Sequence, residues 1–294
     1  MQHVLSANQF TKEDCERLFT IATRIKTSPW AYSHELTGRI MGSLFFEPSL
    51  RTRCSFEVAM NRLGGKVFSE GNATYSTSTA KGESFKDTLK TISQYVDVVV
   101  VRHPQEEIVA ESANMSDVPV INGGDGMNEH PTQALLDLYT IKDAFENTEG
   151  LTVLFTGDLL CSRTIRSLLK LLKPYGTKNI LARAMPPDLA YFENWSWIEE
   201  GQIEELLPTV DVVYMTRHQR ERSLAREESR FVMTAKLAEK MKPTSVIMHP
   251  LPRTEELLEE VDNNHRAIYF QQAKNGMWVR MALLYSLLKE RDWQ

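Results

Sequence analysis

A run of valines at residues 96–101 is the feature that most limits how this chain can fold. Successive side chains of a strand point to opposite faces, so a strand that is apolar at nearly every position must be covered on both faces. Strands of this kind are typical of parallel sheets that carry helices on either side. The run therefore predicts an α/β fold.

The rest of the chain alternates between short β-branched segments and helical patterns. Strands are expected at residues 42–46, 118–121, 153–156, 179–182, 210–215 and 245–248, and helices at residues 51–63, 131–145, 164–172 and 277–289. This alternation predicts parallel sheets flanked by helices. Such sheets bind ligands beyond the carboxyl ends of their strands, so the residues just after each strand are the first candidates for a functional site.

The sequence V-D-V-V occurs twice, at residues 96–99 and 210–213, and an arginine follows each copy, Arg102 and Arg217. Chance similarity between two valine-rich strands is one explanation. The other is a pair of similar α/β domains, each of which contributes one strand-end arginine to a shared cleft.

A length of 294 residues, of which 42% are apolar, suits two domains better than one. We expect a first domain at residues 1–140 and a second at residues 141–276, with the active site in the cleft between them. The C-terminal helix, residues 277–294, is expected to pack back onto the first domain.

Composition excludes several classes of protein. The net charge of −5 is mild and the 34 Lys and Arg residues are dispersed, so neither nucleic acid nor a membrane is expected as a partner. Cys15, Cys54 and Cys161 form an odd, widely spaced set, which predicts neither a disulfide framework nor a metal site. No apolar run reaches the ~20 residues that cross a bilayer. The acidic residues near the N-terminus argue against a transit peptide, and we expect a cytoplasmic protein.

The motif E-P-S-L-R-T-R, residues 47–53, lies between an expected strand and an expected helix. A helix N-terminus exposes unpaired N–H groups and a partial positive charge, which together bind phosphate. Ser49 and Thr52 add hydroxyl groups, and Arg51 adds a guanidinium that matches phosphate oxygens. An ordinary helix start with surface arginines is the alternative interpretation.

Two further motifs follow strands in the first half of the chain. Arg102 comes directly after the valine run, where many α/β proteins carry a ligand-binding residue. In the motif H-P-T-Q, His130 and Gln133 fall about one helical turn apart and can face one ligand. An imidazole that donates to a carbonyl oxygen would polarise the carbonyl for nucleophilic attack. The alternative is a capped helix with a histidine that has only structural contacts.

The second half offers three motifs of the same kind. G-D-L-L-C-S-R, residues 157–163, has one glycine where a dinucleotide-binding loop would have three, so no nucleotide cofactor is expected, and Arg163 could bind a carboxylate. The segment R-H-Q, residues 217–219, comes just after an expected strand and contains two more candidate ligands, Arg217 and Gln219. In H-P-L-P-R, residues 249–253, the prolines fix the backbone so that a bare carbonyl can face a ligand ammonium.

Taken together, these motifs resemble those of the aspartate/ornithine carbamoyltransferase family nearly from end to end. The matching strings are F-F-E-P-S-L-R-T-R at 45–53, R-H-P-Q at 102–105, H-P-T-Q-A-L-L-D at 130–137, R-x-Q at 217–219, H-P-L-P-R at 249–253 and F-Q-Q-A at 270–273. The resemblance implies transfer of a carbamoyl group from carbamoyl phosphate to the amine of an amino acid. Ornithine-type members carry H-P-C-Q and H-C-L-P at two of these places. The difference favours aspartate as acceptor, hence N-carbamoyl-L-aspartate as product, in de novo pyrimidine biosynthesis.

The resemblance also implies a role for each matching residue. The implied phosphate ligands are Ser49, Arg51, Thr52, Arg102 and Lys81, the last on a mobile loop at residues 69–84. The resemblance implies that His130 and Gln133 bind the carbonyl and the amide of the carbamoyl group. The implied acceptor ligands are Arg163, Arg217 and Gln219 for the carboxylates, with backbone carbonyls from Leu251 and Pro252. The family further implies a homotrimer whose active sites are shared through the Lys81 loop, and it leaves open a regulatory chain or a larger multienzyme complex as a partner.

Leu50 departs from the family pattern. Aspartate-specific members usually read S-T-R-T-R, whereas this chain reads S-L-R-T-R. We associate the leucine with the branch that acts on acylated ornithine. Transfer to ornithine or an acylated ornithine, and a catalytically silent scaffold relative, are therefore the alternatives to the aspartate reaction.

Overall fold

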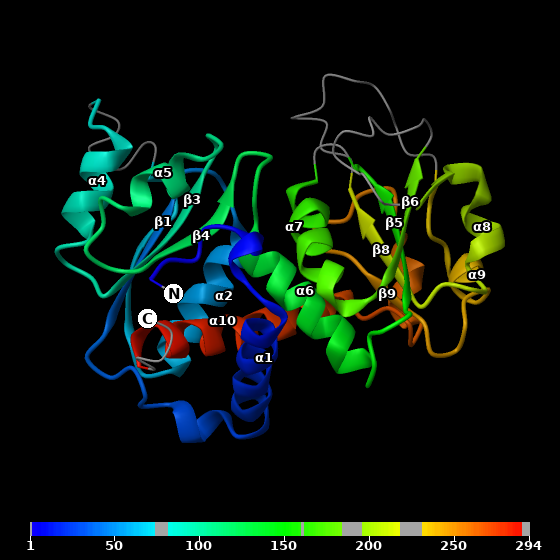
Figure 1. Cartoon of the computed structure of the whole chain (residues 1–294), viewed down its shortest axis with the longest axis horizontal. Coiled ribbons are helices and arrows are strands. Elements are labelled where there is room, and N and C mark those ends of the chain that lie inside the picture. The colour runs from blue at the N-terminus through cyan, green and yellow to red at the C-terminus, as the bar shows by residue number, and fades with distance from the viewer. Residues whose placement is uncertain (1, 74–81, 160–161, 184–195, 218–230, 290–294) are drawn as a thin grey trace. The chain divides into compact units, whose positions relative to one another are not determined.

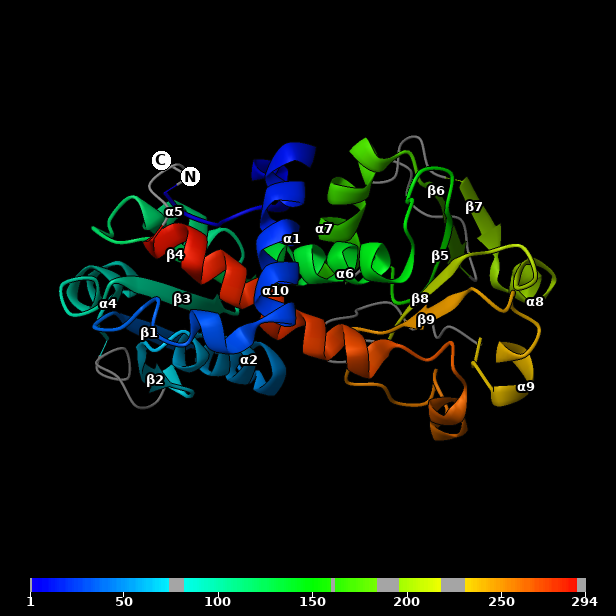
Figure 2. The ribbon, with the colours of Figure 1, turned by 90° about the horizontal axis from the view of Figure 1, so that it is seen from below.

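The computed structural model describes residues 2–73, 82–159, 162–183, 196–217 and 231–289. The chain divides into two compact units, the first made of Met1–Tyr139 with Lys274–Gln294 and the second of Thr140–Ala273. Each unit contains one parallel sheet with helices packed against it (Figures 1 and 2), which confirms the predicted fold class. The family resemblance implies that residues 1–140 bind carbamoyl phosphate and residues 141–276 bind aspartate, and this assignment stays a prediction.

The sheet of the first unit has the strand order β2-β1-β3-β4, and all its pairs are parallel. Its strands are β1 (Ile40–Phe45), β2 (Lys66–Glu70), β3 (Val98–His103) and β4 (Val120–Asp125). Its helices are α1 (Lys12–Thr27), α2 (Leu50–Arg62), α4 (Phe85–Ile92) and α5 (Ile108–Ala113), with the short 3₁₀ segments η1 (Ala7–Gln9) and η2 (Pro29–Tyr32).

The sheet of the second unit has the order β7-β6-β5-β8-β9, again with parallel pairs only. Its strands are β5 (Thr152–Gly157), β6 (Lys178–Arg183), β7 (Ser196–Glu199), β8 (Val212–Thr216) and β9 (Val246–Met248). Its helices are α7 (Arg163–Leu172), α8 (Ile203–Leu206) and α9 (Ala235–Ala238), with 3₁₀ segments η4 (Lys173–Tyr175), η6 (Glu200–Gln202) and η7 (Glu259–Asn263). Two helices run from one unit into the other along the chain, α6 (Pro131–Ala144) and α10 (Tyr269–Leu288).

The valine run behaves as predicted. Val98, Val99, Val100 and Val101 have no exposed surface, so β3 is covered on both faces. Burial of an aliphatic side chain of this size contributes about 1.5 to 3 kcal/mol, which makes this strand a principal source of cohesion for the first unit. β8 is likewise buried at each of its five positions.

The repeated V-D-V-V sequence has a structural meaning at the starting edge of each sheet. Asp97 accepts from the backbone N–H of Ile40 at 2.8 Å and donates its own N–H to the carbonyl of Ile40 at 2.8 Å. Asp211 does the same with Thr152, at 2.8 and 2.9 Å. Each aspartate thus joins a central strand to its neighbour, β3 to β1 and β8 to β5. The recurrence agrees with two units built to one plan.

Some boundaries differ from the predictions. The last helix begins at Tyr269 rather than at 277. Gly276 lowered the expected helical tendency of that segment, yet in the structure a Cβ there would meet Nη1 of Arg280 at 2.6 Å and Cδ2 of Leu136 at 2.9 Å. The glycine is therefore a point of close packing within a continuous helix. Strands β2 and β7 were not predicted. β2 lies at a sheet edge and is half to fully exposed along its length, so it lacks an apolar run.

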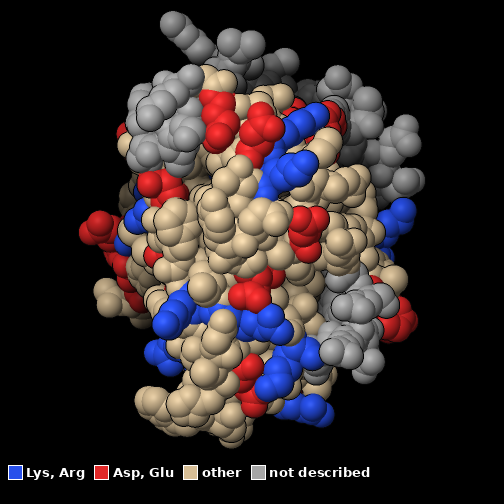
Figure 3. All heavy atoms as spheres, turned by 90° about the vertical axis from the view of Figure 1, so that its left-hand side faces the viewer, with Lys and Arg blue, Asp and Glu red and all other residues tan. Residues whose placement is uncertain are grey.

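Within the described segments, no helix is both long enough and apolar enough to cross a membrane. On the face of the molecule shown in Figure 3, acidic and basic side chains are interspersed among uncharged ones.

Gly157 is required by the pairing of β5 with β8. Its φ is +98°, and a Cβ at this position would lie 1.9 Å from the backbone oxygen of Thr216. We predict that Gly157→Ala lowers the free energy of unfolding by more than about 3 kcal/mol, because neither backbone can yield without breaking the pairing.

Gly150→Ala is the matched control. Gly150 also has a positive φ, +76°, but a Cβ there would have open space around it. Gly150→Ala should lower the free energy of unfolding only by the cost of placing alanine in a left-handed backbone conformation, about 1 to 2 kcal/mol. Urea unfolding followed by circular dichroism measures both values, and equal losses would contradict the steric account.

Candidate active site

Three of the predicted phosphate ligands, Ser49, Arg51 and Thr52, lie at the start of α2. Ser49 is the N-cap residue, with extended backbone angles, and its side chain makes no capping hydrogen bond among the described residues. Arg51 and Leu50 are exposed, Leu50 by 70%. The first N–H groups of a helix have no acceptor within the helix and carry a partial positive charge, an arrangement that suits an anion.

Thr52 and His130 come together from opposite halves of the first unit. The side-chain oxygen Oγ1 of Thr52 lies 3.3 Å from Nε2 of His130, within hydrogen-bond distance. Both residues are almost fully buried, with 5% and 4% of their surface exposed. The structure thus joins the first turn of α2 to the start of α6, while the roles of the two residues stay predictions.

Arg102 ends β3 and has an acidic partner that the sequence did not suggest. Its Nη2 lies 2.7 Å from Oε1 of Glu47, and its Nη1 donates to the carbonyl of Gly123 at 3.4 Å. Both charged side chains are about one-seventh exposed, at 14% and 13%. An anion that binds Arg102 must compete with Glu47 for the guanidinium.

The loop that leads from β4 to His130 is held by a buried carboxylate, Asp125. Its side chain has no exposed surface. Oδ1 accepts from the Asn122 amide at 3.0 Å and from the Glu129 N–H at 3.0 Å, and Oδ2 accepts from the Glu107 N–H at 2.9 Å and the Asn128 amide at 3.0 Å. One side chain therefore ties the loop after β3 to the loop after β4. Sequence reasoning missed this residue, although three of its four donors lie within four residues of it, because neither its burial nor its contact with Glu107 has a sequence signal.

Gln133 lies on the first turn of α6 and is half-buried, and its side-chain nitrogen donates to Asp137 at 2.8 Å. Lys81, the remaining predicted ligand in this half of the chain, lies outside the described residues, as do residues 74–80 of the predicted loop around it.

In the second unit, two arginines follow neighbouring strands. β5 pairs with β8 so that Gly157 lies opposite Thr216. Arg217 comes directly after Thr216 and is half-buried, and Arg163 begins α7 just beyond β5 with only 5% of its surface exposed. Both cations thus follow the carboxyl edge of the same part of the sheet. Gln219 lies outside the described residues.

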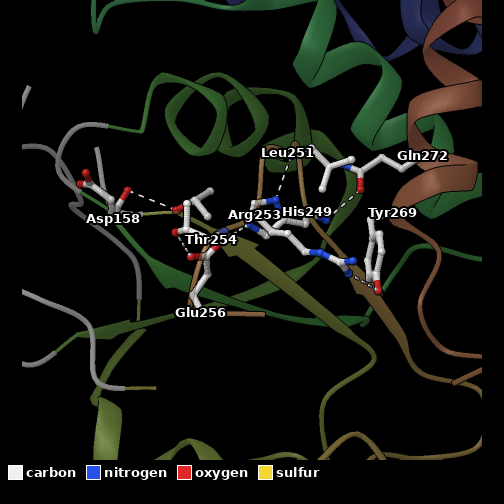
Figure 4. Close-up of polar contacts among 9 residues, drawn as sticks. Asp158, His249, Leu251, Arg253, Thr254, Glu256, Tyr269 and Gln272 are labelled. Atoms are coloured by element: carbon white, nitrogen blue, oxygen red, sulfur yellow. Dashed lines mark hydrogen bonds and ion pairs between the residues drawn. The ribbon is translucent and has the colours of Figure 1, made fainter. Parts of the chain in front are cut away.

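The turn that carries Leu251 and Pro252 follows β9, and its hydrogen bonds are drawn in Figure 4. The peptide bond between the two residues is cis, and Leu251 has a φ of +57°, which is uncommon for a residue with a side chain. Its N–H donates to Nδ1 of His249 at 2.8 Å (Figure 4). That bond occupies the N–H of Leu251 and leaves its carbonyl for another partner.

His249 and Glu256 form a buried pair behind this turn, with 1% and 5% of their surface exposed. Because Nδ1 of His249 accepts from Leu251, the ring proton of the neutral histidine is on Nε2, which donates to Oε1 of Glu256 at 2.9 Å. Burial opposes ionisation of Glu256, but hydrogen bonds from His249 and Thr254 outweigh it and lower the pKa of Glu256 to about 2. The carboxylate therefore fixes the tautomer and the orientation of the ring that holds Leu251.

Arg253 anchors the other side of the turn. Its guanidinium forms an ion pair with Asp262, its Nη1 donates to the hydroxyl of Tyr269 at 3.1 Å, and it lies over the rings of Tyr269 and Phe270. These contacts give the arginine of H-P-L-P-R a structural role, which the sequence had left open.

Comparison with known proteins agrees with this arrangement. Residues 2–143 match the family described as "Aspartate/ornithine carbamoyltransferase, carbamoyl-P binding domain", and residues 149–287 match its "Asp/Orn binding domain". The chain belongs to the aspartate/ornithine carbamoyltransferase family.

Several curated members of the family are similar over the whole chain. The aspartate carbamoyltransferase catalytic subunit of Clostridium perfringens is 42% identical, with 98% of each chain covered. The multifunctional protein CAD of Squalus acanthias is 44% identical over 98% of this chain. The chain spans only 13% of the length of that larger protein.

Solved structures of the family have the same fold. Aspartate transcarbamoylase from Trypanosoma cruzi, in complex with carbamoyl aspartate and phosphate, matches with a TM-score of 0.89 and 37% identity, covering 98% of this chain and 96% of that one. The same enzyme in complex with N-(phosphonacetyl)-L-aspartic acid matches with a TM-score of 0.88 and 37% identity, covering 98% and 95%.

We predict that Glu256→Gln destabilises the protein at neutral pH by about 1 to 3 kcal/mol, because the amide cannot accept all the hydrogen bonds that the carboxylate accepts. The pKa of Glu256 in the folded protein, about 2, is below the ordinary value of 4.5. Its contribution is therefore complete above about pH 4.5 and is lost as the pH falls toward 2. The difference in stability between wild type and variant should shrink over that window.

Urea unfolding at a series of pH values measures this difference. The exposed Glu239 of the same unit supplies the control, since Glu239→Gln should change stability by no more than about 0.5 kcal/mol. A Glu256→Gln effect that stays constant down to pH 3 would mean that the charge of Glu256 does not hold the turn.

Proposed function

We propose that this protein transfers the carbamoyl group of carbamoyl phosphate to the amine of L-aspartate, giving N-carbamoyl-L-aspartate and phosphate, a step of pyrimidine biosynthesis. The observation that carries the proposal is the full-length match to proteins named aspartate carbamoyltransferase catalytic subunit, together with a structural match to that enzyme in complex with carbamoyl aspartate.

The first unit suits carbamoyl phosphate. The N-terminus of α2, with Ser49, Arg51 and Thr52, would bind the phosphate, and Lys81 would add a further charge. Arg102 would give up its ion pair with Glu47 and contact the same substrate, because the Glu47 carboxylate and the phosphate compete for its guanidinium. His130 and Gln133 would hold the carbamoyl oxygen and nitrogen.

The second unit suits the acceptor. Arg163 and Arg217, with Gln219, would bind the two carboxylates of aspartate, for which an arginine fork is well matched. Leu251 and Pro252 would offer backbone carbonyls to the amine. Ornithine is a poorer match to this set of residues, because its side chain is a cation.

The mechanism follows from these placements. The aspartate amine attacks the carbamoyl carbon, a tetrahedral oxyanion forms, and phosphate leaves. His130, Thr52 and Arg102 would stabilise the oxyanion, a contribution of about 3 kcal/mol for each well-placed donor. Holding both substrates in reach removes much of the entropy cost of their encounter. The departing phosphate is the proposed acceptor of the amine proton, and no cofactor takes part in the proposed steps.

Leu50 is the reason for testing ornithine and acylated ornithine as alternative acceptors. Its side chain is 70% exposed, so it contributes little packing at the start of α2, while its backbone N–H is still available to a phosphate. The side chain therefore gives no structural reason to exclude aspartate.

The test is a steady-state assay of the purified protein with carbamoyl phosphate and, in turn, aspartate, ornithine and N-acetylornithine. We predict turnover with aspartate at a kcat/KM at least about 100-fold above that of either alternative. Arg51→Ala, purified in the same way, should lose turnover by about 100-fold or more while remaining folded, which excludes a contaminating host enzyme. Turnover with an ornithine compound alone would contradict the proposal, and no turnover with any acceptor would favour a silent scaffold.

We further propose a cytoplasmic homotrimer in which the loop that carries Lys81 enters the active site of a neighbouring chain. The proposal rests on the family resemblance. In a closed ring every such interface is equivalent, so each site would combine Lys81 of one chain with all the other ligands of the next. A regulatory chain or a larger complex is a further partner to be sought, since relatives are named "catalytic subunit" and "Multifunctional protein".

Mixed trimers test the shared site. Lys81→Ala spoils the donated loop and Arg163→Ala spoils the receiving site, so each variant alone should be nearly inactive. Unfolding equal amounts together and refolding them should recover about a quarter of wild-type activity, because each mixed ring contains one intact interface.

The control is a mixture of Arg51→Ala with Arg163→Ala. Both changes lie in the receiving chain, so no combination restores a complete site and activity should stay at the level of the parents. If native mass spectrometry detects Lys81→Ala and Arg163→Ala mixed rings without recovered activity, the site is not shared in this way.

A further inference from the structure

The side-chain amide of Gln133 has a fixed direction in the structure. Its nitrogen Nε2 donates to Oδ1 of Asp137 at 2.8 Å, one turn further along α6. A carboxylate has no hydrogen to donate, so the end of the Gln133 amide that faces Asp137 must be the nitrogen. The oxygen Oε1 of Gln133 therefore points away from Asp137.

Asp137 is itself held by burial and charge. Its side chain has no exposed surface, and it interacts electrostatically with Arg280 of α10, which is 3% exposed. Burial lowers the pKa of Arg280 to about 10 and Asp137 opposes that shift, so the guanidinium is charged at neutral pH. Arg280 lies over the ring of Phe56 at 5.0 Å, and Gly276 leaves room for it.

We propose that Asp137 determines specificity for the carbamoyl group, by turning the Gln133 amide so that its oxygen accepts a hydrogen bond from the carbamoyl NH₂. This inference rests on the proposed function, in which Gln133 contacts that group. Asp137 acts through Gln133 and is a positioning residue. The charged hydrogen bond also polarises the amide, which makes Oε1 a stronger acceptor.

The consequence is discrimination between acyl phosphates of nearly the same shape. Acetyl phosphate has the phosphate and the carbonyl of carbamoyl phosphate but a methyl group in place of NH₂. A methyl group cannot donate to Oε1, so the acetyl compound leaves a polar group without its partner. The orientation of the Gln133 amide should therefore strongly affect the binding of carbamoyl phosphate and have little effect on the binding of acetyl phosphate.

Asp137→Asn reverses the arrangement with little change of shape. Arg280 attracts the oxygen of the introduced amide, so its NH₂ is left facing Gln133. Gln133 then turns its own oxygen inward and presents its nitrogen to the carbamoyl NH₂. We expect kcat/KM for carbamoyl phosphate to fall about 10- to 100-fold, while the inhibition constant of acetyl phosphate, competing with carbamoyl phosphate, changes by less than about threefold.

Two further variants separate positioning from general damage. In a Gln133→Ala background, Asp137→Asn should cause no further loss beyond about threefold, because the residue through which it acts is gone. Asp137→Asn combined with Arg280→Met removes both buried charges, which is often tolerated. There the introduced amide can turn either end to Gln133, so kcat/KM should lie between the wild type and the single variant.

Each outcome has a definite meaning. The proposal would be overturned if Asp137→Asn weakened the binding of acetyl phosphate by the same factor as it lowered kcat/KM for carbamoyl phosphate. It would also be overturned if Asp137→Asn lowered kcat/KM in the Gln133→Ala background as much as in the wild type. If the single variant does not fold, the double variant decides, and wild-type discrimination in it would overturn the proposal as well. If the wild type shows no turnover, the proposed function fails instead, and the dissociation constants of the two acyl phosphates in wild type and variants then test Asp137 by binding alone.

Discussion

Parallel pairing of β1 with β3 and of β5 with β8 is the constraint that brings the predicted ligands together within each unit. In the first unit it places Phe45 opposite Arg102, so the chain that leaves β1 for α2 starts beside the arginine at the end of β3. In the second unit it places Gly157 opposite Thr216, so the segments that lead to Arg163 and Arg217 leave the same edge. Asp97 and Asp211 secure the same strand pairs at the opposite edge. Residues far apart in sequence become neighbours because their strands end together.

Three buried carboxylates hold residues that are predicted to bind the substrates, two of them in the first unit and one in the second. Asp125 holds the loop before His130, Asp137 orients Gln133, and Glu256 fixes the ring that holds Leu251. Each accepts hydrogen bonds from groups that need a fixed direction, and a charged acceptor gives stronger bonds than a neutral one. Glu47 differs from these three, because it pairs directly with Arg102, which is itself a predicted phosphate ligand. Buried negative charge thus aligns the hydrogen-bonding groups around the residues that are predicted to bind the substrates.

Much of this could be predicted from the sequence, because strong apolar periodicity and strand-end motifs are local signals. The valine run gave β3, and the strand–helix alternation gave parallel sheets. Asp125 was missed because its role depends on burial and on the contact with Glu107 in another loop, although its other donors, Asn122, Asn128 and Glu129, are close to it in sequence. Asp137 had a local signal, since Gln and Asp four residues apart on a helix can form a hydrogen bond. Edge strand β2 lacks an apolar run, and the start of α10 was misplaced because Gly276 serves packing rather than a helix end.

The central claim is a division of labour, with the phosphate bound by the first unit and the dicarboxylate by the second. Calorimetry with inorganic phosphate, and with succinate in saturating phosphate, tests it most directly on Arg51→Ala and Arg217→Ala. Arg51→Ala should weaken phosphate binding by about tenfold or more. Arg217→Ala should leave phosphate binding within about threefold of wild type and weaken succinate binding by about tenfold or more. Equal loss of phosphate binding in the two variants would contradict the account.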